Sequence, residues 1–283
     1  MAVRLAAVSD DISSDFAEAA EIAVEVELDG LAVRHVGGIN IRDLDDDTVR
    51  MIRRVADERG LEIVAVTSPF GRDVTLDMPD DSALALLERM FRCADLLGTP
   101  LIRVFAPWIG GHDPLPAWRD RPAPDPRVTE RMSRYASAAA NAGATLMLEL
   151  EGASYVGTVA EAAAVLDAVR SPTLALCWDV CNGWWSGEAP WEDGWRKAQR
   201  LPIVDVQAKD VRVGADGRPA FEQVVLGDGD VPYDQIIPAL LQRGYDQWFT
   251  AERVYHPRKP EQEPKLREDI LADLARLRAL TAA

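Results

Sequence analysis

Short apolar runs and longer amphipathic segments alternate along the whole chain. The apolar runs are rich in Val, Ile and Leu, as expected of strands that are covered on both faces. They predict strands over residues 3–8, 31–36, 61–67, 100–105, 145–150, 173–178, 203–208 and 247–252. The segments between them predict helices over 13–24, 43–59, 82–97, 128–142, 158–169, 194–200, 231–243 and 263–280. Two of these segments repeat their apolar residues with a clear helical period, Leu87, Met90, Phe91, Ala94 and Leu97 in one and Leu266, Ile270, Leu274 and Leu277 in the other.

Strands that alternate with helices are typical of a parallel sheet with crossover helices. Eight strands and eight helices in 283 residues fit a closed (β/α)₈ barrel, which typically needs about 250 residues. No linker, low-complexity segment or long internal repeat divides the chain. We therefore expect one α/β domain over residues 1–283, a single-domain (β/α)8 TIM barrel, with an open doubly wound sheet as the alternative.

Composition narrows the environment and the partners. The net charge of -16 disfavours nucleic acid, because phosphate backbones are bound mainly by Lys and Arg. The three cysteines form no CxxC pair, so a disulfide framework is not expected. The first residues contain no signal-peptide stretch, and the sequence has no apolar run of about 18 residues, the length that a membrane span needs. These features predict a reduced, cytoplasmic, globular protein without a membrane partner.

Four carboxylate or amide side chains stand where four predicted strands end. They are Glu149, Asp179, Gln207 and Glu252. Because the strand ends of a parallel barrel converge, these side chains predict a site for one divalent metal ion. Mg²⁺ or Mn²⁺ suits such oxygen ligands, and Zn²⁺ suits them less because it prefers His and Cys. The alternative is that these acids cap neighbouring helices or pair with basic residues.

Two residues near these strand ends are candidate substrate contacts. Lys209 lies two residues beyond Gln207, so it faces the same side of its strand. It could hold a substrate oxyanion or hydroxyl, or pair with a ligand carboxylate. His256 follows the predicted eighth strand and could act as an acid or base, with an exposed loop histidine as the alternative.

Three long connections follow predicted strand ends, over 106–126, 181–193 and 211–230. Such loops form the active-site face of a barrel. The first two carry Trp108 and Trp184, whose flat rings could stack on the C–H face of a sugar. Tryptophans serve equally well to bury a long loop or to make a dimer contact, so a homo-oligomer stays open.

The second half of the chain resembles the sugar phosphate isomerase/epimerase family, the xylose-isomerase-like barrels. In that family the fifth strand ends in Glu, the sixth in Asp-x-x-His, the seventh in His-x-Lys-Asp and the eighth in Glu. The corresponding places here read Glu149, Asp179-Val180-Cys181-Asn182, Gln207-Ala208-Lys209-Asp210 and Glu252, and Gly227-Asp228-Gly229-Asp230 matches the family's Gly-Glu-Gly-Asp. In the first half, Ser68-Pro69-Phe70-Gly71 resembles the third-strand loop of one subgroup.

The resemblance implies roles for these residues. Glu149 and Glu252 would act as a catalytic pair that moves a proton to and from the carbon beside a carbonyl. Asn182 stands where many members have a substrate-contacting His, and Gln207 where many have a metal-ligating His. Gln at that point resembles the dehydratases that act on 3-dehydroshikimate. The three histidines of the chain are too few for the multi-zinc DNA-repair endonucleases that share the fold.

The sequence therefore predicts a metal-dependent isomerase or epimerase that acts on a keto-sugar or related polyhydroxy ketone. One alternative is a dehydratase, that is, a lyase of the 3-dehydroshikimate or inosose dehydratase type. Another is a barrel that binds a carbohydrate or a partner protein without catalysis. Because no phosphate-binding glycine loop is evident, we do not expect the substrate to be phosphorylated.

Overall fold

The computed structural model describes residues 3–109, 121–253 and 260–282 and contains a closed barrel of eight strands. The strands follow one another around the barrel in the order β1, β2, β5, β6, β7, β8, β9 and β12, and every neighbouring pair is parallel. Their bounds are Arg4–Val8, Gly30–Val33, Glu62–Val66, Leu101–Val104, Thr145–Glu149, Leu174–Asp179, Ile203–Ala208 and Trp248–Ala251. The predicted (β/α)₈ barrel is confirmed, and the open sheet is excluded.

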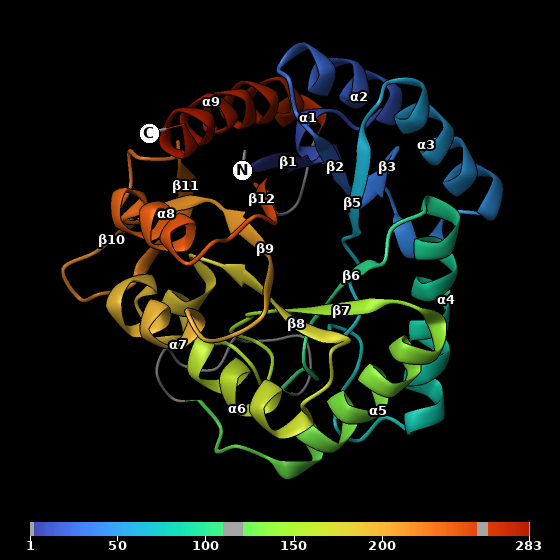
Figure 1. Cartoon of the computed structure of the whole chain (residues 1–283), viewed down its shortest axis with the longest axis vertical. Helices are drawn as coiled ribbons and strands as arrows, with labels where there is room; N and C mark the ends of the chain where they lie inside the picture. Colours follow the sequence, from blue (N-terminus) through green and yellow to red (C-terminus); the bar gives the residue numbers. More distant parts are fainter. Residues whose placement is uncertain (1–2, 110–120, 254–259, 283) are drawn as a thin grey trace.

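The helices form a ring outside the strands, and the chain follows this ring clockwise from blue to red in Figure 1. They are α1 (Ser9–Ile12), α2 (Phe16–Glu25), α3 (Asp46–Glu58), α4 (Asp80–Leu97), α5 (Pro126–Ala142), α6 (Val159–Val169), α7 (Trp195–Ala198), α8 (Tyr233–Gln242) and α9 (Glu263–Thr281). Single turns lie at η1 (Ile41–Asp43), η2 (Asn182–Ser186), η3 (Pro190–Gly194) and η4 (Pro260–Gln262). Of the helices in the described ranges, none combines the length and apolar character that crossing a membrane requires.

Local sequence sets where these helices begin and end. Asp15 and Asp45 accept a hydrogen bond from a backbone N–H in the first turn of α2 and α3, as N-cap side chains do. At the start of α6, Thr158 and Glu161 form a reciprocal capping box. The chain leaves α4 through Gly98, which has a φ of 68° and therefore takes the left-handed conformation without a Cβ clash.

Two short hairpins follow barrel strands, and the first contains His35 and Val36, which the sequence had assigned to the end of the strand predicted over 31–36. Strands β3 (His35–Val36) and β4 (Ile39–Asn40) pair after β2, and β10 (Asp210–Val213) and β11 (Pro219–Val224) pair after β9. Both hairpins follow the carboxyl ends of barrel strands. They therefore belong to the face where the predicted ligands lie.

The apolar residues divide into a large outer core and a small inner one. Along β8, Leu174, Leu176 and Trp178 pack in the outer core between strands and helices, whereas Cys177 lies in the inner cluster inside the barrel. Because side chains alternate along a strand, Asp179 shares the inward direction of Cys177. Strand β8 therefore places its last residue inside the mouth of the barrel.

At the end of β12, the side chain of Arg253 points out of the barrel, in the opposite direction to that of Asp179. Its Nε and Nη2 donate to the carboxylate of Asp273 on α9 at 2.5 and 2.8 Å, and both side chains are 2 % exposed. The Asp273 carboxylate also accepts a hydrogen bond from the Leu226 N–H at 2.9 Å. This buried ion pair fastens the last helix to the strand that carries Glu252.

Candidate active site

Three carboxylates converge at the carboxyl ends of the barrel strands. One oxygen each from Glu149, Asp179 and Glu252 lies within 4.8 Å of the others, and all three residues are buried. Gln207 is the register partner of Asp179 on the neighbouring strand. The four side chains that the sequence singled out therefore share the upper interior of the barrel, where enzymes of this architecture carry their active sites.

Gln207 provides a direct test of whether a metal ion fits this site. Its side chain is 1 % exposed, and its Oε1 is buried without a hydrogen-bond partner in the described part of the chain. A buried acceptor without a partner costs about 1–3 kcal/mol. An amide oxygen beside three carboxylates is a donor that hard divalent cations accept. The residues present therefore fit such a cation.

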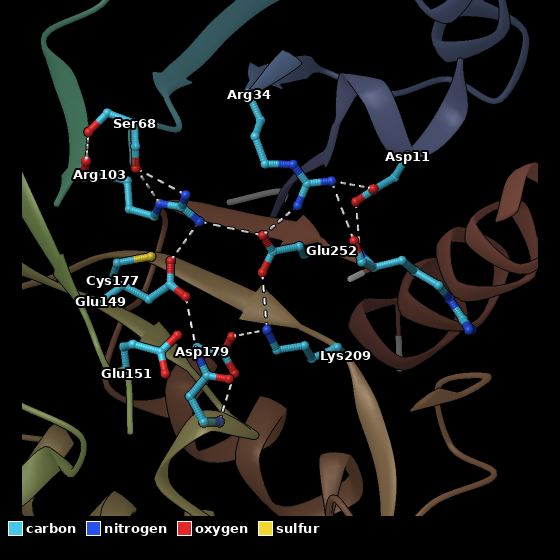
Figure 2. A network of polar contacts seen from close by, with 12 residues as sticks. Asp11, Arg34, Ser68, Arg103, Glu149, Glu151, Cys177, Asp179, Lys209 and Glu252 are labelled. Carbon is cyan, nitrogen blue, oxygen red and sulfur yellow. Dashed lines mark hydrogen bonds and ion pairs between the residues drawn. The ribbon is translucent and has the colours of Figure 1, made fainter. Parts of the chain in front are cut away.

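Three cations surround Glu252, as Figure 2 shows. Arg34 Nη1 lies 3.1 Å from Oε1, Arg103 Nη1 lies 3.5 Å from the same oxygen, and Lys209 Nζ lies 3.1 Å from Oε2. Each cation also contacts a second acid. Arg34 pairs with Asp10 and Asp11, Arg103 with Glu149, and Lys209 with Asp179.

The charges in this network do not balance. When all five are ionised, the carboxylates of Asp10, Asp11, Glu149, Asp179 and Glu252 face the three cations of Arg34, Arg103 and Lys209, which leaves two negative charges in excess while His35, 3.4 Å from Asp10, is counted as neutral. Buried charges without a partner are costly. A divalent cation carries the charge that would neutralise this excess.

Burial shifts the pKa values of the site residues. It raises the pKa of Glu149, an effect that Arg103 opposes and Glu252 and Asp179 strengthen. It also raises the pKa of Asp179, although Lys209 acts in the other direction. At Glu252, burial is outweighed by Lys209, Arg34 and Arg103, so its pKa is lowered. A bound cation would favour the ionised form of all three acids.

Asn182 lies in η2 and holds two of the acids. Its side-chain amide donates to Glu149 Oε1 at 3.0 Å and to the Leu150 carbonyl at 2.7 Å, and its backbone N–H donates to Asp179 Oδ1 at 2.9 Å. Asn182 thus orients Glu149, and its predicted contact with substrate stays a prediction. For Lys209, the alternative prediction of an ion pair with a ligand carboxylate is confirmed, because it pairs with Asp179 and Glu252.

The glycine-rich motif at 227–230 fixes the backbone behind Lys209. The carboxylate of Asp210 accepts the N–H groups of Gly227, Gly229 and Val231 at 2.9–3.1 Å. A Cβ on Gly229 would lie 2.2 Å from Asp210 Oδ1, so only glycine permits this approach. The motif therefore anchors the end of β9, and with it the direction of Lys209.

The aromatic candidates pack against other aromatic and apolar side chains. Trp108 follows β6 and packs edge-on against Phe105, with ring centroids 6.2 Å apart. Trp184 lies in η2 and packs, half-buried, against the outer core. Trp195 stacks on both Trp178 and Trp191, which favours the loop-burying interpretation for these three rings. The roles of Trp108 and Trp184 stay predictions, and His256 lies outside the described residues, as does His112.

The sequence interpretation missed Arg34 with its partners Asp10 and Asp11. A signal for Arg34 was present, because it follows the inward-facing Ala32 by two residues within the strand predicted over 31–36. Period-two counting along that strand would have placed Arg34 inside the barrel. Asp10 follows β1 in the short helix α1, so strand counting does not reach it.

Comparison with known proteins identifies the family of this chain. A family model described as a xylose isomerase-like TIM barrel matches residues 16–279. A search of curated proteins found no match.

Solved structures with the same fold cover nearly the whole chain. The probable 3-DHS dehydratase AsbF from Bacillus anthracis is 18% identical with a TM-score of 0.73, covering 98% of this chain and 99% of its own. D-psicose 3-epimerase, solved in the presence of D-fructose, is 18% identical with a TM-score of 0.71, covering 99% and 100%. The IolI protein with a bound zinc atom is 13% identical with a TM-score of 0.75, covering 99% and 98%. At these identities the similarity shows the fold alone.

Proposed function

Because this chain belongs to the xylose isomerase-like TIM barrel family, we propose that it is a divalent-metal-dependent isomerase or epimerase. Its substrate would be a keto-sugar or a related polyhydroxy ketone. The cation would be held by Glu149, Asp179, Gln207 and Glu252. The observation that carries the proposal is the convergence of three buried carboxylates beside the unpartnered Gln207 Oε1.

The donor set also decides which cation we propose. All four side chains offer oxygen, which favours Mg²⁺ or Mn²⁺ over Zn²⁺. The zinc atom in the IolI protein makes Zn²⁺ the alternative to compare. A divalent cation bound here would polarise a substrate carbonyl and so ease the loss of a proton from the neighbouring carbon.

The remaining chemistry is assigned to the chain's own residues. Glu149 and Glu252 are proposed to take and return the proton, since a positioned carboxylate can act as a general base. Asn182 would hold Glu149 in place through its 3.0 Å hydrogen bond. Lys209 would keep Glu252 ionised and present a cation toward a substrate hydroxyl.

A dehydratase reaction is the second candidate. The amide at Gln207 supports it, because Gln at this point resembles the dehydratases of this barrel group, and the fold matches that of the probable 3-DHS dehydratase. The same proton would be removed first, and a hydroxyl on the next carbon would then leave.

One experiment tests both reactions. The purified protein would be analysed for bound metal and then incubated in D₂O with a panel of keto-sugars and keto-cyclitols, with and without EDTA. We expect metal-dependent deuterium exchange at the carbon beside the carbonyl, with an ultraviolet-absorbing enone only if elimination follows. Turnover that persists after complete metal removal would refute the mechanism. Protein that retains no metal and exchanges no proton would favour a non-catalytic binding barrel.

Replacing Gln207 with methionine should change stability and metal affinity in opposite directions. The variant removes a buried oxygen that has no partner, so the metal-free protein should gain about 1 kcal/mol in its free energy of unfolding. It also removes a ligand, so Mn²⁺ should bind about tenfold more weakly, or weaker still. Urea denaturation and Mn²⁺ titration measure the two effects. A less stable metal-free variant with unchanged Mn²⁺ affinity would contradict the assignment of Gln207.

A further inference from the structure

The loop between β5 and α4 lies against the segment that follows β6. The Phe105 N–H donates to the Phe70 carbonyl at 2.9 Å, and the Trp108 N–H donates to the Val74 carbonyl at 2.7 Å. Gly71 has a φ of 105°, and a Cβ there would lie 2.4 Å from the Phe105 carbonyl oxygen. This close backbone contact gives the next residue, Arg72, a fixed position on the active-site face.

The guanidinium of Arg72 makes few polar contacts with the described residues. Its Cζ lies 5.0 Å from the ring centroid of Phe105 and 6.0 Å from that of Trp108. Its Nε is buried without a hydrogen-bond partner, and its one ion pair among the described residues is with Glu151, at 3.7 Å. By contrast, Arg103 donates to the Ser68 carbonyl and to Glu149 at 3.0–3.2 Å.

The position of Arg72 links it to the carboxylate cluster. Arg103 packs over the same Phe105 ring, with its Cζ 4.7 Å from the centroid, and it also contacts Glu149. Burial lowers the pKa of Arg72 and the charge of Arg103 lowers it further, while Glu151, Glu149 and Glu252 oppose both. Arg72 therefore lies beside the site. Its Nε is buried, whereas 40 % of the side-chain surface is exposed and open to a ligand.

We propose that Arg72 binds a carboxylate of the substrate, so that this enzyme acts on an anionic polyhydroxy ketone rather than a neutral one. The inference rests on the proposed function, because it assigns a second contact to the same substrate. A guanidinium presents a planar pair of donors that matches a carboxylate. Supported by the two aromatic rings, this pair would fix the end of the substrate remote from the reacting carbonyl.

Carboxylate is favoured over phosphate by the charge of the surroundings. A phosphate monoester carries up to two negative charges, and Arg72 supplies one positive charge that it shares with Glu151. The nearby cations Arg34, Arg103 and Lys209 are already paired with acids. A singly charged planar group therefore fits this position better.

The test compares three ligands that differ at one carbon, namely D-fructuronate, D-fructose and D-fructose 6-phosphate. Each is titrated calorimetrically into Mn²⁺-loaded wild-type protein and into the Arg72→Gln and Arg72→Lys variants. We expect the wild type to bind the carboxylate about tenfold or more tightly than fructose, as a charge-assisted bidentate contact allows. Arg72→Gln should lose that preference while its affinity for fructose stays the same, and Arg72→Lys should recover part of it.

Controls separate this inference from the proposed function. Arg50→Gln removes a positive charge from the exposed face of α3 and should leave the carboxylate preference intact, and thermal unfolding checks that each variant is folded. Equal or tighter binding of fructose or of the phosphate, no binding of the carboxylate, or wild-type carboxylate affinity in Arg72→Gln would overturn the assignment. The titrations are repeated on metal-free protein, so failure to retain Mn²⁺ counts against the metal site and leaves the role of Arg72 measurable.

Discussion

Replacing Glu252 with glutamine should remove most of the affinity for a divalent cation. The substitution keeps the shape of the side chain but deletes one of the three converging carboxylates, and it leaves three cations facing a neutral group. We expect Mn²⁺ to bind at least about 100-fold more weakly, since loss of even an outer-shell partner costs 10–100-fold. Turnover of the wild-type substrate should fall by about 10³-fold, because the proposed general base is lost as well.

The metal-induced gain in stability measures this effect without any substrate. At an Mn²⁺ concentration of about 100 times the wild-type dissociation constant, linkage predicts a gain of about 2.7 kcal/mol for the wild type. The same concentration should stabilise Glu252→Gln by less than about 0.5 kcal/mol. Urea denaturation with and without Mn²⁺ gives both values.

Glu88→Gln provides a matched control on the exposed face of α4. It makes the same chemical change outside the barrel and should respond to Mn²⁺ as the wild type does. The Glu252→Gln protein should still fold, because each of its three cations keeps another acidic partner. Wild-type Mn²⁺ affinity in the variant would exclude Glu252 as a ligand.

The sequence was sufficient for the barrel because its signals are local. Each barrel strand begins and ends within three residues of its predicted bounds, since short Val- and Ile-rich runs separated by amphipathic helices leave few other arrangements. The two hairpins were not predicted. Strands β3 and β4 are two residues each, too short for a hydrophobic period to appear.

The candidate site was only partly predictable. Glu149, Asp179, Gln207 and Glu252 stand out because each ends an apolar run, and the structure brings them together. What the sequence could not show is which basic side chains pair with these acids. The pairing of Arg34 with Asp10, Asp11 and Glu252 joins residues up to 218 positions apart, and only closure of the barrel between β1 and β12 makes it possible.

The tryptophans show a second limit of prediction from the sequence. Five of the eight lie between residues 178 and 195, and their density suggests a sugar-binding surface. Trp178 instead points into the outer core and stacks on Trp195, which stacks on Trp191. The alternation of side chains along β8 distinguishes a core tryptophan from one at the site, because Trp178 lies between the inward-facing Cys177 and Asp179 and must face away from them.

The second large effect is expected in stability, from Arg253→Met. The substitution keeps the length of the side chain but leaves the buried Asp273 without the cation that contacts both of its oxygens. Breaking a buried ion pair from one side typically costs about 3–5 kcal/mol. That is a large share of the 5–15 kcal/mol that stabilises a typical domain, so the urea midpoint should fall steeply.

The double variant Arg253→Met with Asp273→Leu tests the reason for that loss. An apolar pair of similar volume should restore most of the stability, with a deficit of about 1 kcal/mol because the Leu226 N–H loses its acceptor. A double variant no more stable than Arg253→Met would show that the cost comes from lost packing rather than from an unpaired buried charge.

Arg253 also connects the helix ring to the charged site, because its backbone N–H donates to Asp11 at 2.8 Å and its side chain pairs with Asp273 on α9. Glu252, the residue before it, is therefore positioned by contacts on both sides of the strand. We expect Arg253→Met to weaken Mn²⁺ binding as well.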